Sequence, residues 1–133
     1  MNIKRFFTAA IALFAFIFVY ESLIHGHLLL SLYSQTPNAW RDFADIKSLV
    51  PYNIGIMLLL AFWITFIFTR FFNTGGWKNG VKFGFYLGVL SGIQAAGAYY
   101  YLPITFTLTI AWFIFGVIES TLGGLLIGMI YKV

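Results

Sequence analysis

The sequence contains no cysteine and very little charge. Only 9% of its 133 residues are charged, whereas soluble domains carry about a quarter. Because cysteine is absent, disulfides, iron–sulfur clusters and thiolate metal sites within the chain are excluded. So few charges could not cover the surface of a soluble domain of this length, so an ordinary globular protein is excluded as well.

Catalytic and nucleic-acid-binding patterns are also missing. The formal net charge of +4 is small and scattered, and no basic stripe marks a nucleic-acid surface. The sequence contains no P-loop, no nucleophile elbow and no His-Glu-x-x-His motif. We therefore predict a protein that is not an enzyme and does not bind nucleic acid.

What the chain has in abundance is apolar sequence. Hydrophobic residues make up 61% and aromatic residues 21% of the chain, as expected for a membrane protein. A span needs roughly 20 apolar residues. We predict an all-α fold, a bundle of four transmembrane helices in a single membrane domain of residues 1–133. The spans are expected at about residues 6–33, 52–70, 81–99 and 105–130.

A short amphipathic helix is expected on the membrane surface between the first two spans, over about residues 37–50. Pro37 suits its first helical position, and Trp40 and Phe43 recur at helical spacing. Pro51 is expected to end it. The side chains predicted at the membrane interface are Trp40, Arg41 and Trp77.

The distribution of basic residues predicts the orientation. Only Arg41 and Lys47 lie on the side of the surface helix, and the others gather on the opposite side. Because positive residues stay cytoplasmic, both termini are expected in the cytoplasm and the surface helix at the periplasmic face of a bacterial inner membrane. In plan the chain resembles small four-span bacterial membrane proteins with a histidine late in the first span and glycines in the third. The basic residues of the cytoplasmic side are Lys4, Arg5, Arg70, Lys78, Lys82 and Lys132.

Small residues recur at four-residue spacing in the third and fourth predicted spans. Lipid gives no hydrophobic drive for helix pairing, so small residues stabilise a pair by letting the backbones approach. The simplest interpretation is a seam between these two helices, and the alternative is that one stripe meets a partner subunit or a flat ligand. The stripes are Gly84, Gly88, Gly92 and Ala96, and Gly116, Ser120, Gly124 and Gly128.

Polar side chains inside the predicted spans form the candidate site. At 1.5 Å per residue, Glu21, Gln94 and Glu119 fall at one depth, slightly outside the membrane midplane. His25 lies one turn from Glu21 on the same face. Gln94 is about opposite the glycine stripe of its helix, and this position weakens the argument for including it in the intramembrane polar cluster.

Several interpretations of this cluster remain open. It could be structural, it could carry protons or cations, or it could form salt bridges with a partner subunit. A metal site is a weak alternative with Glu21, His25 and Glu119 as ligands, and we predict no metal. His25 and His27 are roughly 200° apart around a regular helix, so they cannot share one metal unless Gly26 loosens it.

We expect a small accessory or structural subunit of a larger inner-membrane complex, such as an energy-converting or electron-transfer one. The alternative is a small oligomeric transporter or channel that moves protons or cations through Glu21, His25 and Glu119. Membrane lipids and other membrane subunits, or copies of this chain, are the expected partners. No cofactor is predicted, although the many aromatic side chains leave a quinone or pigment contact as an alternative.

Overall fold

The computed structural model describes residues 2–72 and 75–132. The described part is helical and contains no strand, only an isolated antiparallel bridge between Gly75 and Lys132. Three of its helices are long and apolar enough to cross a membrane: Ile3–Leu28, Val50–Phe71 and Phe106–Ile130. The predictions of an all-helical fold and of a membrane protein are therefore confirmed.

The first helix changes its winding near its end. Helix α1 (Ile3–Leu23) continues through a π-helical turn, Ile24–Leu28, to the short helix α2 (Leu30–Tyr33). A 3-10 turn and helix α3 follow before three long helices complete the fold. The bounds are Pro37–Ala39 for the turn, Phe43–Ser48 for α3, Val50–Phe71 for α4, Trp77–Ala96 for α5 and Phe106–Ile130 for α6, with a 3-10 turn Gly97–Tyr100 after α5.

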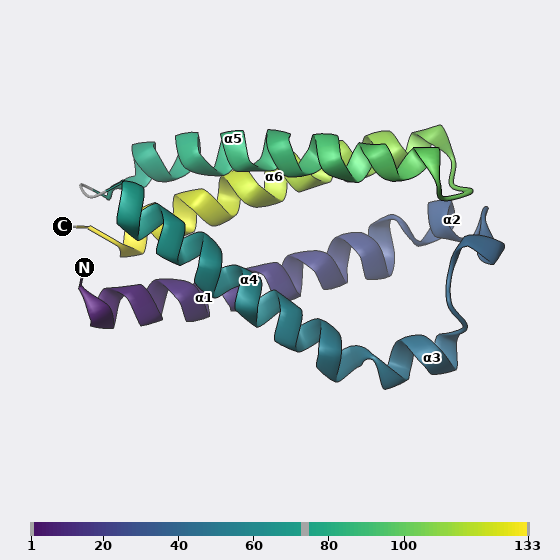
Figure 1. Ribbon diagram of the computed structural model, residues 1–133, viewed down its shortest axis with the longest axis horizontal. Helices are drawn as coiled ribbons and strands as arrows, with labels where there is room; N and C mark the ends of the chain where they lie inside the picture. Colours follow the sequence, from purple (N-terminus) through teal and green to yellow (C-terminus); the bar gives the residue numbers. More distant parts are fainter. Residues whose placement is uncertain (1, 73–74, 133) are drawn as a thin grey trace.

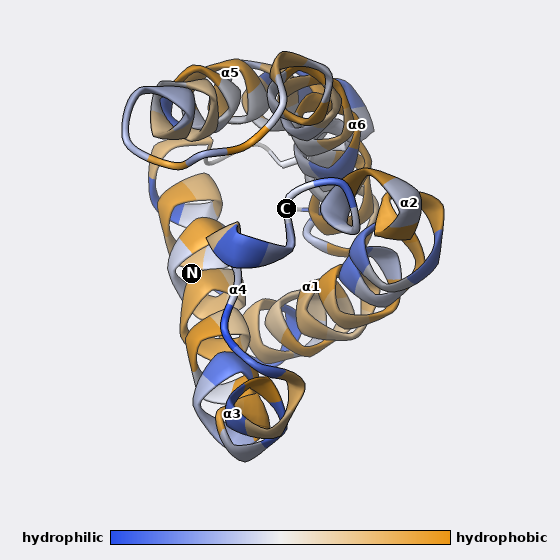
Figure 2. Ribbon diagram, turned by 90° about the vertical axis from the view of Figure 1, so that its right-hand side faces the viewer, coloured by the Kyte–Doolittle hydropathy of each residue, from blue (hydrophilic) through white to orange (hydrophobic). Residues whose placement is uncertain are grey.

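The long helices run between two ends of the molecule. Both chain termini lie at one end, here called the terminal end, whereas α2 and α3 lie at the other, the loop end (Figure 1). Helices α5 and α6 run side by side, and α4 crosses α1 at an angle (Figure 1). Viewed along the bundle, α1, α4, α5 and α6 surround a central region (Figure 2).

The segment predicted as one surface helix is not a single helix. Residues 37–39 form a 3-10 turn, Trp40 is extended, and α3 begins only at Phe43. Trp40 leaves the predicted stripe because its indole nitrogen donates to the carbonyl oxygen of Tyr33, 3.1 Å away. Pro51 is predicted to end the surface helix, but it lies in the first turn of α4. That position suits proline, since its missing N–H is not needed there.

Backbone contacts between the glycines of α5 and α6 hold these helices together. A Cβ atom on Gly84 would lie 2.1 Å from the carbonyl oxygen of Ser120, and one on Gly124 would lie 2.2 Å from that of Gly80. No side chain fits at such distances, so the two backbones are in direct contact. This close approach gains dispersion contacts that larger residues would prevent. The buried glycines of α5 are Gly80, Gly84, Gly88 and Gly92.

The remaining stripe residues differ in their surroundings. A Cβ atom on Gly92 would meet the ring of Phe113 at 2.8 Å, and one on Gly128 would meet backbone just before α5. Nothing lies within 4 Å of the corresponding position on Gly116, and Ala96 is half-buried. The contact therefore changes along the seam from backbone at the terminal end to a side chain nearer the loop end.

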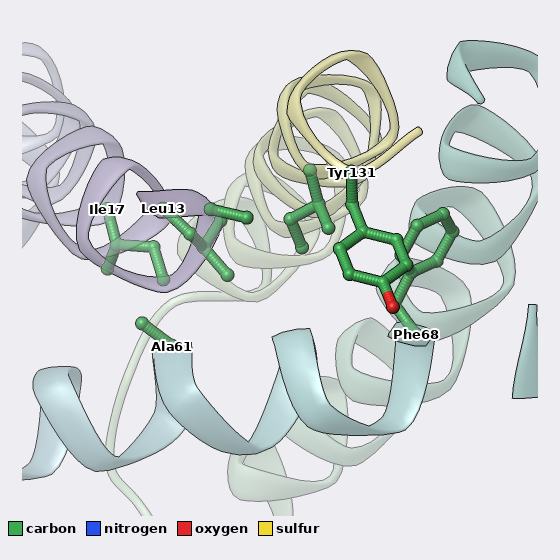
Figure 3. Packing of buried hydrophobic residues seen from close by; sticks show 7 residues of the cluster. Leu13, Ile17, Ala61, Phe68 and Tyr131 are labelled. Atoms are coloured by element: carbon green, nitrogen blue, oxygen red, sulfur yellow. The ribbon is translucent and has the colours of Figure 1, made fainter. Parts of the chain in front are cut away.

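One hydrophobic core cluster lies at the terminal end, and a second one, around Leu29, Ile104 and Leu108, lies at the loop end. Leu13 and Ile17 from α1 face Ala61 from α4, and Phe68 lies beside Tyr131 (Figure 3). All five are buried. Phe68 also stacks on neighbouring aromatic rings of the α4–α5 connection and of α5. Aromatic packing thus joins α4 to α5 at this end of the bundle.

The two chain ends are tied together at the same place. The backbone N–H of Asn2 donates to the hydroxyl of Tyr131, 3.3 Å away, and the guanidinium of Arg5 donates to the carbonyl oxygen of Lys132. The side chain of Asn2 also caps α1 by accepting from the N–H of Arg5. Gly75 forms its bridge to Lys132 here. The terminal end is accordingly closed by both packing and hydrogen bonds.

Candidate functional site: an intramembrane carboxyl pair

The π-helical turn places His25 between two partners. Its Nε2 lies 3.4 Å from Oε2 of Glu21, and its Nδ1 is hydrogen-bonded to the hydroxyl of Tyr33. The turn is closed by a bond from the N–H of Leu29 to the carbonyl oxygen of Ile24, five residues earlier. Such turns often occur at functional sites.

Tyr33 extends this network to α6. Its hydroxyl accepts a hydrogen bond from the indole N–H of Trp112 at 2.8 Å, while Trp40 packs on its ring with centroids 5.0 Å apart. One assignment of protons satisfies every group. The Trp112 N–H donates to Tyr33, the Tyr33 hydroxyl donates to Nδ1 of His25, and the Nε2–H of His25 points to Glu21.

Glu119 of α6 meets Glu21 of α1. The two side chains line the same two cavities, so their carboxyl groups lie close together. Oε1 of Glu119 is buried and has no hydrogen-bond donor among the described residues. Two carboxylates side by side repel each other, which favours a proton on one of them, and a pair that holds one proton carries one negative charge.

The carboxyl pair separates two cavities. The terminal-side cavity has a volume of about 250 Å³ and lies against α1, α4, α5 and α6. The loop-side cavity has a volume of about 220 Å³ and also receives His25 and Trp112. Glu21 and Glu119 line both. The pair is therefore the point at which the two cavities approach each other.

The surroundings of the pair differ toward the two ends of the molecule. Toward the loop end, His25, Tyr33 and Trp112 continue the polar network. Toward the terminal end, the buried apolar residues of the core, including Leu13 and Phe68, follow the cavity. Polar contacts thus reach the pair from the loop end, where Tyr33 and Trp112 are themselves packed in the second apolar cluster, and the first apolar cluster lies on the other side.

Gln94 does not join the polar cluster. It is exposed, and the side chains of α5 that reach the loop-side cavity are Ser91, Gly92 and Ala95. The reason is helical geometry, because a residue opposite the glycine seam points away from α6. Of the predicted cluster, Glu21, His25 and Glu119 come together.

The predicted interfacial residues lie in different settings. Trp40 is half-buried against Tyr33 and Trp112. Arg41 is exposed at the loop end. Trp77 is exposed at the start of α5, with the ammonium group of Lys78 5.7 Å from its ring centroid.

Sequence reasoning missed Tyr33, Trp112 and Asn53 as parts of the site. Tyr33 and Trp112 carry the hydrogen bonds that lead away from His25, and Asn53 of α4 lines the terminal-side cavity. For Tyr33 and Trp112 the sequence offered one chemical signal, since a buried tyrosine or tryptophan usually finds a partner for its polar atom. No rule of residue spacing predicts the contact between α2 and α6.

The site does not match a metal centre. Within residues 2–72 and 75–132, no group of three histidine, cysteine or acidic side chains could hold a metal ion. His27 lies apart from the cluster, where its Nδ1 is 3.1 Å from the carbonyl oxygen of Ser22. Divalent cations such as calcium need six or more oxygen ligands, which this pair does not provide.

No family model, no curated protein and no solved structure matches this chain. Its function has to be inferred from its fold and from the carboxyl pair.

Proposed function

We propose that the chain is a four-span transporter in which the Glu21–Glu119 pair takes up and releases a proton or a monovalent cation. One observation carries this proposal. A line of polar side chains leads from Glu119 of α6 through Glu21 and His25 to Tyr33 at the loop end. Ionisable groups inside a membrane are costly and commonly mark ion or proton pathways.

The fourth span of this proposal is α5. Its 20 residues reach about 30 Å, the thickness of the hydrocarbon core. Two lysines and several glycines lower its hydropathy, and the lysines lie in its first turns, at the terminal end. Its glycines are buried against α6, an apolar span. This packing supports a place for α5 beside α6 in the membrane.

The proposed orientation places the terminal end in the cytoplasm. Basic residues gather at that end, where Arg5, Lys78 and Lys132 lie. Positive residues favour the cytoplasmic side, so α2 and α3 would face the periplasm of a bacterial inner membrane. The carboxyl pair would then exchange with the periplasmic side, and the apolar core would close the cytoplasmic side. A closed side favours a transporter that changes conformation over an open channel.

Flux through liposomes tests the proposal. Purified protein is reconstituted, and the movement of protons, Na⁺ and K⁺ is measured under an imposed gradient. We expect flux of one of these ions above that of protein-free liposomes. Glu21→Gln and Glu119→Gln should each reduce it at least about tenfold, because an amide takes up no proton and has no negative charge to attract a cation.

Asp45→Asn is the matched control. Asp45 is an exposed carboxylate in α3, outside the network, so this variant should retain wild-type flux. Gel filtration of each variant in detergent checks that the fold survives. Equal flux from wild type and from the Glu21→Gln, Glu119→Gln double variant would refute the proposal, as would the absence of flux of all three ions.

The second candidate is the accessory subunit of a larger membrane complex. It is favoured by the outward face of α4, where Leu59, Trp63 and Ile67 are exposed and could meet another helix. The glycine stripes give it little support, since all their glycines except Gly116 pack within this chain. Purification in mild detergent with mass spectrometry separates the two candidates. A subunit should retain partners at fixed stoichiometry, and a transporter should be recovered as copies of this chain alone.

A further inference from the structure

The terminal-side cavity combines a charged end with apolar walls. Glu21 and Glu119 lie at the charged end, with Ser120 and the amide of Asn53 as the other polar lining groups. All other lining residues are apolar or glycine: Leu13, Ile17, Ile56, Met57, Leu60, Ile64, Leu87, Gly123 and Gly124. A metal cation would leave most of these walls without a suitable partner, because it needs a shell of oxygen ligands, whereas a proton needs only the carboxyl pair.

The volume suits a small organic molecule. An apolar cavity of about 150 Å³ can hold a benzene molecule. The terminal-side cavity has about 250 Å³, which accommodates a ring and a compact charged head. A carboxyl pair that shares one proton carries a single negative charge, so a head with one positive charge is its electrostatic complement.

The cavity is accessible from the side of the bundle. Ile56 and Leu60 of α4 line it and are nevertheless 45% and 49% exposed. Helix α4 packs mainly on α1, and its ring contacts with Phe83 of α5 lie at the terminal end, around Phe68. In a membrane, the opening beside Ile56 and Leu60 faces lipid. A ligand with an apolar body can reach it by partitioning into the bilayer.

We propose that the terminal-side cavity binds a lipophilic organic monocation, with a compact ammonium head at the Glu21–Glu119 pair and an apolar body against α4. This inference rests on the proposed function, since it assigns the substrate class of the same carboxyl pair. A single aromatic ring joined to a quaternary ammonium group has the required size, shape and charge.

The probe is radiolabelled benzyltrimethylammonium, whose binding to purified protein in detergent is measured by equilibrium dialysis. Neopentylbenzene has the same shape without the charge and serves as the matched ligand. We expect saturable binding of one benzyltrimethylammonium per chain, and at least about tenfold weaker binding of neopentylbenzene. Glu119→Gln should weaken binding of the cation to the same extent, because it removes the charge that the ammonium head pairs with.

A pair of tryptophan variants on α4 locates the bound ligand. Leu60→Trp places a large ring in the cavity and should abolish binding. Leu59→Trp adds the same ring at a neighbouring exposed position that does not line the cavity, and it should bind as the wild type does. Equal effects of the two variants would overturn the proposed location.

The outcomes distinguish this inference from the proposed function. Absence of saturable binding, or equal binding of the charged and neutral ligands, overturns the inference. If the liposome assay still shows ion flux that depends on Glu21 and Glu119, the proposed function survives that result. If flux and cation binding are both absent, both proposals fail.

Discussion

The α5–α6 pair and the α1–α4 side of the bundle are built in opposite ways. Between α5 and α6 the backbones touch, and Gly84 leaves no space for even a methyl group beside Ser120. Between α4 and the α5–α6 pair, a cavity of about 250 Å³ reaches the carboxyl pair. One half of the molecule is therefore closely packed, and the other half keeps space beside its charged groups.

This difference follows from how helices associate in lipid. Apolar side chains gain nothing by leaving lipid for another helix, so close backbone packing has to hold the pair together. A seam of this kind has no room for water or a ligand. Space for a ligand remains where α4 diverges, and the half-buried carboxyl groups of α1 and α6 lie beside that space.

The largest expected effect comes from filling the closely packed seam. Gly84→Leu places a side chain where the carbonyl oxygen of Ser120 lies, so α5 and α6 must separate. Overpacking of this kind costs about 3 kcal/mol. Thermal unfolding in detergent measures the loss. Gly55→Leu is the control, since nothing lies within 4 Å of a Cβ atom on Gly55 of α4. Equal melting temperatures for the two variants would show that the seam is not closely packed.

A smaller effect is expected at the loop end of the α1–α4 side. Tyr33→Phe removes the hydroxyl that accepts a hydrogen bond from Trp112 and bonds to His25. The indole nitrogen of Trp112 and Nδ1 of His25 then both lose this partner. Loss of such a hydrogen bond costs about 2 kcal/mol. Unfolding followed by tryptophan fluorescence reports both the stability and the setting of Trp112. Tyr101→Phe, at an exposed tyrosine of the same end, should change neither; an equal change there would contradict the assigned network.

The smallest effect is expected where the seam meets a side chain. Gly92→Ala brings its Cβ atom against the ring of Phe113 at 2.8 Å, and a ring can shift where a backbone cannot. We expect a loss below about 1 kcal/mol, less than for Gly84→Ala in the same assay. The reverse order would mean that α5 and α6 are closest at the loop end.

Residue patterns account for much of this architecture. Low charge and long apolar runs predict the helical membrane fold, and helix rise places Glu21 and Glu119 at one depth. The position of Trp40 could not be predicted, because its tertiary bond to Tyr33 overrides the helical spacing of residues 37–50. Pro51 is compatible with either role, since proline suits a helix start as well as a stop. The contact between Tyr33 and Trp112 depends on tertiary structure that no local pattern encodes.

The π-helical turn at Ile24–Leu28 changes the direction in which the residues after it point. A wider turn accommodates one residue more than regular α-helical winding would, so every residue beyond it is rotated by about 100° relative to Glu21. Regular α-helical winding of the same residues would remove that rotation. Tyr33 would then point away from Trp112, although no side chain of the network had been changed. The winding of this segment is thus as much a part of the site as the identity of its residues.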